Sequence, residues 1–264
     1  MWMAGGVWLR DIWRYREVFY LLALRDTKLR YRQTVLGSLW AVIQPLLTML
    51  LFTLIFGRLA GIPSDGLPYP VFYYAALLPW VYFSNTVSQA AASLLGNAHL
   101  ITKVYFPRVA LPVAPALSGL VDLGVGSLML LGLLVYYGTP LTWRLLVWPP
   151  IAALLVLFTC AIGILLSALN VRYRDVKHAV PFLLQLWLFA TPIIYPASMV
   201  PEPFQPFLFL NPLAAIVTAF RASCGAGPEL DWGSLAVSTA MVAALLGLAA
   251  LYFSRAEATL SDIV

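Results

Sequence analysis

The chain has 264 residues, of which 62% are hydrophobic and only 10% are charged, with a formal net charge of +5. Soluble proteins carry about 25% charged residues, so this composition excludes an ordinary soluble domain and indicates an all-α membrane protein. The positive charge does not indicate nucleic-acid binding, because its distribution follows the expected membrane topology.

The segment 10–34 is predicted to form an amphipathic helix at the membrane surface. Ile12, Tyr15 and Phe19 begin an apolar series at helical spacing. The cations expected to share another face are Arg14, Arg25, Lys28 and Arg32. Such a helix places its charges among lipid headgroups and its apolar side toward the acyl chains. The alternative, a helix packed on a soluble core, fits poorly with the uncharged run that follows directly.

Six apolar runs are expected to cross the membrane, because about 20 apolar residues in a helix span roughly 30 Å of hydrocarbon. The runs are 36–57, 69–95, 113–137, 145–169, 179–195 and 235–253. Prolines divide the segment 196–233, which is predicted to form short external helices that enter the membrane and return. Asn211 before Pro212 is typical of a helix start. A seventh crossing is the alternative.

Six spans place both termini on one side of the membrane. Thirteen of the sixteen Lys and Arg residues then fall on that side, and only Arg58, Arg144 and Arg221 fall on the other. Cytoplasmic loops are enriched in Lys and Arg, so both termini are predicted to be cytoplasmic. A seventh span would move only Arg255, so charge alone does not exclude it. Residues 1–264 are interpreted as one permease domain.

The sequence carries no motif for nucleotide or metal chemistry. It contains no GxxxxGK[ST] loop, no HExxH and no paired CxxC, and its two histidines lie in different expected loops. We therefore predict no catalytic residue, no metal site and no cofactor on this chain, and we expect any energy source on a separate chain. Cys160 and Cys224 are interpreted as ordinary small residues.

Asp122 is an ionisable residue within an expected span, in the small-residue stretch SGLVDLGVGS. An intramembrane carboxylate is a functional candidate. The alternative is a structural group bonded to a neighbouring helix, and we favour it because a single carboxylate makes a poor proton relay. The glycines around it predict close approach of another helix.

Two short loops on the cytoplasmic side, 97–111 and 170–178, are compact and mixed in polarity. Few rotatable bonds separate them from the spans, so they are suited to transmit force from a docked partner. The residues assigned to this role are Asn97, Lys103, Phe106, Pro107, Arg108, Asn170, Arg174 and Asp175. The alternative is a plain connection that only follows the positive-inside pattern.

Several of these stretches, in order, resemble the ATP-binding-cassette permeases that export bacterial polysaccharides, a family of O-antigen, teichoic-acid and capsule exporters. The likeness is closest to the O-antigen type. It rests on the following stretches: 37–40 with 44–46, 97–112, 170–176, and 191–196 with 211–213.

The resemblance implies a permease subunit rather than an enzyme, in the bacterial cytoplasmic membrane. It implies a homodimer of six-span subunits with two copies of a cytoplasmic ATPase, which would bind ATP and Mg²⁺. The loop after the second span would be a coupling helix, and the substrate would be a glycan on a polyprenyl pyrophosphate lipid.

Aromatic side chains offer flat apolar platforms on which the faces of sugar rings can slide. The candidates for such a passage are Trp40, Tyr73, Trp80, Tyr82, Phe83, Trp187, Phe189 and Tyr195. The alternative is that these residues gather at membrane interfaces, as aromatics do in membrane proteins generally. The cations of segment 10–34 could attract the substrate pyrophosphate or simply hold anionic membrane lipids.

Two other functions are consistent with parts of the sequence. One is a related permease for a small amphipathic, drug-like compound. The other is an intramembrane glycosyl or prenyl transferase, which would need clustered carboxylates to hold metal and pyrophosphate. A structural scaffold would leave the compact loops unexplained. None of the motifs identifies a sugar.

Overall fold

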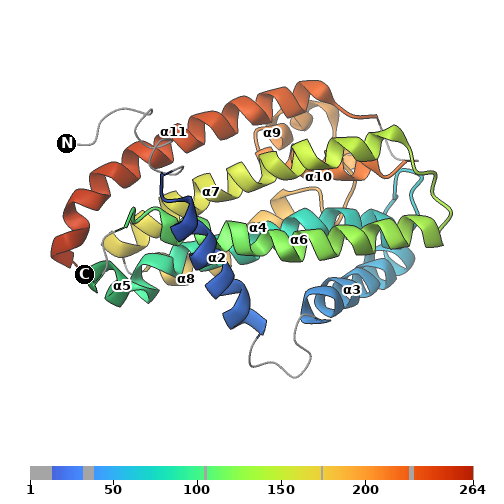
Figure 1. The fold of residues 1–264 in the computed structure, drawn as a ribbon. Coiled ribbons are helices and arrows are strands. Elements are labelled where there is room, and N and C mark those ends of the chain that lie inside the picture. Colours follow the sequence, from blue (N-terminus) through green and yellow to red (C-terminus); the bar gives the residue numbers. More distant parts are fainter. Residues whose placement is uncertain (1–13, 32–38, 104–105, 174, 226–228, 264) are drawn as a thin grey trace.

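The computed structural model describes residues 14–31, 39–103, 106–173, 175–225 and 229–263, and the regular elements in these ranges are all helical. The long helices lie side by side, and α2 (Arg16–Tyr31) crosses in front of them (Figure 1). The all-helical membrane architecture predicted from the composition is confirmed.

The centre of the molecule is α4 (Tyr69–Gly96), in which every residue from 71 to 80 is buried. It lies between α6 (Ala110–Tyr136) and α7 (Trp148–Arg172), and α11 (Trp232–Ile263) packs on α7. Pro70 occupies the first turn of α4, where a missing N–H costs nothing. This arrangement makes α4 the helix on which the others are assembled.

Small residues allow these helices to approach closely. A Cβ at Gly119 of α6 would lie 3.0 Å from the Tyr82 ring, and one at Gly126 would clash with Leu78. In α7, a Cβ at Gly163 would lie 2.8 Å from the Cβ of Ala90. The close approach predicted around Asp122 is therefore confirmed, and it brings α6 directly against α4.

Four stretches in the described residues are long and apolar enough to cross a membrane. They are 42–59 in α3 (Trp40–Phe52) with the π-helix η2 (Thr53–Leu59), 110–136 in α6, 143–172 in η3 (Trp143–Val147) with α7, and 232–257 in α11. Helix α4 is 28 residues long but carries many polar and aromatic residues, and the apolar α8 (Val176–Ala190) has only 15 residues. Six crossings therefore require α4 and α8 as well.

The proline-rich segment after α8 forms short helices. They are η4 (Ala197–Met199), η5 (Glu202–Phe204), α9 (Gln205–Phe209) and α10 (Pro212–Ser223). The chain bends by 104° between 202–209 and 212–223, which is the geometry of a broken span or a re-entrant loop. Asn211 caps α10 as predicted, because its side-chain oxygen accepts a hydrogen bond from the Leu213 N–H at 3.1 Å.

A second, smaller core lies where α2 meets the ends of α4, α6, α7 and α11, close to α5 (Ala98–Lys103). Phe19 of α2 is buried there with Leu94 and Phe253. Leu21 and Leu29 of the same helix are exposed. Apolar residues thus lie on both the packed and the exposed sides of α2, and the amphipathic interfacial helix stays a prediction. The predicted ends, 10–13 and 32–34, lie outside the described residues.

Candidate functional site

Four of the eight candidate passage aromatics are buried in the core of the chain. Tyr73, Trp80, Tyr82 and Phe83 of α4 are each 6% exposed or less. The Phe83 ring stacks on Phe158 of α7, with the two centroids 5.2 Å apart. Tyr82 donates its hydroxyl to the Ala116 carbonyl of α6 at 2.8 Å. In this structure these four side chains hold α4 to its neighbours and present no surface to a substrate.

The other four aromatics lie nearer the surface. Trp40, at the start of α3, is 48% exposed, and Phe189, near the end of α8, is 58% exposed. Trp187 and Tyr195 are half-buried, and the Tyr195 hydroxyl donates to the Phe189 carbonyl at 3.2 Å. Sequence alone did not separate these two groups, because all eight residues have similar apolar surroundings in the chain.

Asn211 fixes the end of α8 to the start of α10. The Trp187 indole N–H donates to Asn211 Oδ1 at 3.1 Å, and Asn211 Nδ2 donates to Thr191 Oγ at 3.0 Å. The Trp187 ring also meets Phe83 edge-on, with the centroids 5.1 Å apart. Trp187 is therefore held in one orientation between the central core and the proline-rich segment.

Arg221 of α10 is a second residue at this end that the sequence did not single out as functional. It is 3% exposed, and its guanidinium donates to the carbonyls of Phe72, Pro192, Ile193 and Tyr195. Its Cζ atom lies 3.6 Å from the centroid of the Phe72 ring. A planar fork with five donors suits this task, since the segment after α8 is not helical and its carbonyls need donors. We refer to this arrangement as the carbonyl clamp.

The predicted coupling residues divide into surface and interior groups. Lys103 of α5 and Asp175 before α8 are exposed. Asn170 is 1% exposed and donates Nδ2 to the Ala91 carbonyl of α4 at 2.9 Å, so it positions α7 against α4.

The remaining coupling residues lie close to the small core. Asn97 caps α4 by donating Nδ2 to the Ser93 carbonyl at 2.8 Å. Phe106 packs against the small core, and Pro107 follows it, half-buried. Arg108 donates Nη1 to the Glu257 carbonyl of α11 at 3.1 Å. Arg174 lies outside the described residues.

The described cations of the N-terminal segment differ in exposure and in their partners, and the shared cationic face stays a prediction. Arg14 and Lys28 are exposed, whereas Arg25 pairs with the adjacent Asp26 at 2.8 Å. Arg32 lies outside the described residues. The cation that reaches into the helices is Arg30, which does not follow the 3- and 4-residue steps between Arg25, Lys28 and Arg32.

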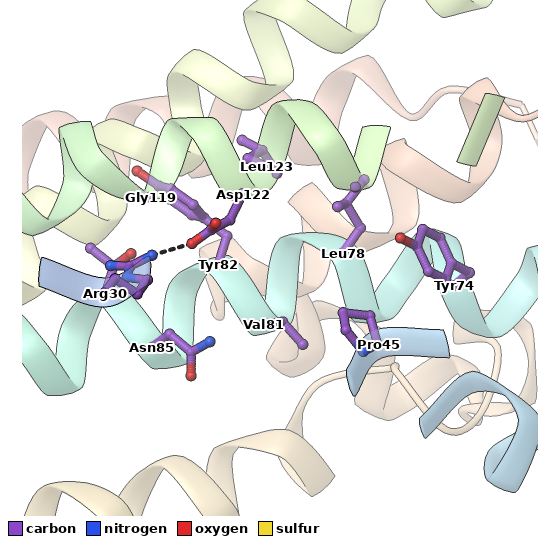
Figure 2. Close-up of a pocket in the computed structure, with 12 residues that line it drawn as sticks. Arg30, Pro45, Tyr74, Leu78, Val81, Tyr82, Asn85, Gly119, Asp122 and Leu123 are labelled. Atoms are coloured by element: carbon purple, nitrogen blue, oxygen red, sulfur yellow. Dashed lines mark hydrogen bonds and ion pairs between the residues drawn. The ribbon is translucent and has the colours of Figure 1, made fainter. Parts of the chain in front are cut away.

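Arg30 forms an ion pair with Asp122 of α6 (Figure 2). Its Nη2 also donates to Gln89 Oε1 of α4 at 2.8 Å and to Ser118 Oγ of α6 at 3.4 Å. This result supports the structural interpretation of Asp122. A signal was present in the sequence, because a carboxylate within an expected span is commonly paired, and a cation elsewhere in the chain is one natural partner.

A cavity of about 30 Å³ lies beside this pair, bounded by α3, α4 and α6. Figure 2 shows Arg30 and Asp122 at one part of its wall and Tyr74 at another. The Tyr74 hydroxyl is buried and finds no hydrogen-bond partner among the described residues. A cavity of this size holds one or two water molecules.

Comparison with known proteins identifies the family. The profile of the ABC-2 type transporter membrane family matches residues 17–224. An O-antigen export system permease from Myxococcus xanthus is 34% identical over 81% of this chain and 82% of its own length, and one from Klebsiella pneumoniae is 33% identical over 78% and 79%. A polysialic acid transport protein of Escherichia coli is 26% identical over 91% and 94%. The chain therefore belongs to the ABC-2 type transporter family of multi-pass membrane proteins.

Proposed function

We propose that this chain is the membrane subunit of an ATP-driven exporter of lipid-linked polysaccharide, of the O-antigen type, in the bacterial cytoplasmic membrane. The observation that carries the proposal is the similarity, over about four-fifths of the chain, to permeases named for O-antigen export. The more distantly similar polysialic acid transport protein is also named for a polysaccharide, so it falls in the same substrate class. The chain is a permease subunit rather than an enzyme.

The proposal includes six spans with both termini in the cytoplasm. Helix α4 would be the second span, since 28 residues in a helix extend about 42 Å. Helix α8 would be the fifth, extended by the buried segment 191–194 that follows it. The bent helices α9 and α10 would enter and leave on the external side. With this arrangement the excess of Lys and Arg lies in the cytoplasm.

Two copies of the chain would enclose the passage for the glycan. Helices α3 and α8 expose apolar faces, which carry Leu47 and Leu51 in α3 and Phe182 and Phe189 in α8. Trp40 and Phe189 are the best candidates for platforms, because they are exposed and aromatic. Trp187 and Tyr195 would support them, and the buried Tyr73, Trp80, Tyr82 and Phe83 would stiffen the wall from behind. Weak contacts at several rings would let a sugar chain advance in steps.

A cytoplasmic ATPase, in two copies and with its own ATP and Mg²⁺, would dock against α5 and the start of α8. Lys103 and Asp175 are exposed there and available to a partner. The movement would pass inward through the contacts described above, which involve Asn97, Phe106, Pro107, Arg108 and Asn170. Arg174 is proposed for the same role from the sequence alone. On the same side, the exposed Arg14 and Lys28, with Arg25 and Arg32, would attract the polyprenyl pyrophosphate group or anionic lipids.

The decisive experiment is to co-express the chain with the ATPase encoded beside its gene and to follow lipid-linked glycan in cells that lack the chain. We expect the two proteins to copurify and the glycan to accumulate inside the deletion strain. Export that is unaffected by the deletion would contradict the proposal. Loss of a small amphipathic compound instead of glycan would indicate the drug-like substrate class.

A charge reversal with a matched control tests the docking surface. Lys103→Glu changes an exposed cation on α5, and Arg58→Glu makes the same change on an exposed residue of η2. We expect only Lys103→Glu to weaken copurification of the ATPase. Equal losses from both variants would remove α5 from the docking surface.

A further inference from the structure

The ion pair between Arg30 and Asp122 joins α2 to the middle of the helix bundle. Asp122 is twelve residues after Ala110, about 18 Å from the start of α6 along its axis. Gln89, the partner of Arg30 on α4, is seven residues before Gly96, about 10 Å from the end of that helix. Arg30 thus contacts both helices well inside their ends.

The two helices that Arg30 contacts are themselves fixed to one another. Gly119 and Gly126 allow α4 to lie directly against α6, and the Tyr82 hydroxyl is bonded to the Ala116 carbonyl. Closely packed helices of this kind shift together more readily than they separate. A displacement of Arg30 therefore acts on α4 and α6 as one body.

The other part of α2 is anchored beside α5. Phe19 is buried in the small core with Leu94, two residues before the end of α4, and with Val109, the residue before α6. From Phe19 to Arg30 is eleven residues, about 16 Å of helix. Helix α2 therefore bridges the small core near α5 and the interior of the bundle.

The cavity beside the pair is small. About 30 Å³ accommodates one or two water molecules. Arg30 is also held by the neutral acceptors Gln89 and Ser118, and opening the pair would leave it without the one charged partner among them. The surroundings therefore favour a pair that stays closed.

We propose that the Arg30–Asp122 pair remains closed during transport and makes α2 a strut that carries movement from the α5 end to α4 and α6 together. Arg30 and Asp122 are then positioning residues for export. This inference rests on the proposed function for its biological meaning, and on the contacts above for its geometry.

The test replaces the ionic link by a reversible covalent one. In a chain carrying Cys160→Ala and Cys224→Ala, the pair Arg30→Cys and Asp122→Cys is treated with a short bifunctional methanethiosulfonate and later with reductant. The readout is glycan exported per ATP hydrolysed, at equal amounts of assembled complex. A purely structural role would change the amount of complex and leave this ratio unchanged.

We expect the unlinked double-cysteine chain to lose at least about fivefold in this ratio, the lower end of typical coupling between sites, and the cross-linked chain to regain it. Asp26→Asn, which removes a carboxylate paired within α2 itself, should leave the ratio unchanged. A cross-link that blocks export, with normal export after reduction, would overturn the proposal, because the pair would then have to open. Equal ratios with and without the link would overturn it as well.

Two further results keep the test decisive. If the double-cysteine chain does not assemble, Arg30→Met with Asp122→Leu removes both charges at once, and the same fall in the ratio is expected from an assembled complex. If the unaltered chain exports no glycan, the proposed function fails. In that case the strut proposal is tested by the rate of ATP hydrolysis in the complex. This rate must differ between the cross-linked and the unlinked double-cysteine chain.

Discussion

Two arginine side chains reach into the helix bundle, Arg30 from α2 and Arg221 from α10. Their guanidinium groups have different kinds of partner. Arg30 meets a carboxylate, Asp122, and both side chains keep about a quarter of their surface exposed. Arg221 is 3% exposed, and the partners that it contacts are backbone carbonyls and the face of Phe72.

The difference in partners predicts how well each arginine tolerates substitution. A charge pair joins two side chains, so it can be exchanged, reversed or replaced by two apolar residues. The carbonyl clamp joins one side chain to a non-helical stretch of backbone, which has no side chain to alter in compensation. We therefore expect Arg221 to tolerate substitution less well than Arg30.

The largest effect is expected at the carbonyl clamp. Arg221→Met removes the donors to four carbonyls and should lower the free energy of unfolding by about 3 kcal/mol or more. Arg221→Lys keeps the charge but offers a compact ammonium in place of the planar fork, so it should recover only part of this loss. Thermal unfolding of the purified chain in detergent measures both. Full recovery with Lys would mean that charge, and not the fork, is required.

Breaking the Arg30–Asp122 ion pair should lower stability by less, and replacing both residues together should recover most of the loss. Asp122→Ala leaves Arg30 without this carboxylate and should cost about 1–2 kcal/mol, reduced from the value for fully buried pairs because of the partial exposure. Arg30→Met combined with Asp122→Leu should restore most of the stability. The same unfolding assay decides the point, and additive losses in the double variant would contradict a direct pair.

Asn211 provides a neutral counterpart at the same end as Arg221. Asn211→Ala removes the helix cap and the bonds to Trp187 and Thr191, and should cost about 1–2 kcal/mol. Asn211→Asp retains the oxygen that accepts from Leu213 and Trp187 but loses the donor to Thr191. It should therefore be milder in the unfolding assay, and tryptophan fluorescence should report a change around Trp187 in both.

The smallest effect is expected from an exposed interaction. Asp231 precedes α11, and its carboxylate accepts from the Ser234 hydroxyl, the Ser234 N–H and the Gly233 N–H. The Ser234 side-chain bond, with the backbone bonds, holds the pKa of Asp231 below its ordinary value of 3.8. A lowered pKa contributes stability above the ordinary value that is lost as the pH falls through and below it.

Asp231→Asn keeps a capping side chain without a titrating group. It should therefore leave stability at neutral pH within about 0.5 kcal/mol and flatten the decline below pH 4. Unfolding measured from pH 3 to 7 is the check. An unchanged acid decline would assign the pH dependence to other carboxylates.

Local chemistry determined much of this protein directly from its sequence. In lipid only helices and closed barrels satisfy their backbone, and uncharged runs of about 20 residues have the length of helices, so the all-helical membrane class followed from the sequence. Asn211 before Pro212 specified a helix start, and the glycines around Asp122 specified close packing, because each depends on residues adjacent in the chain.

Only the tertiary structure decided which partners distant residues would meet. It placed Tyr73 and Phe83 in the core of the chain and left Trp40 and Phe189 exposed, although all four occupy similar apolar runs. In the fold, Asp122 pairs with Arg30 rather than with a neighbouring cation of α2, and Arg221 donates to carbonyls after α8. The physical reason is that burial and pairing depend on how helices cross, and crossing brings together residues separated by 28 to 149 positions in the chain.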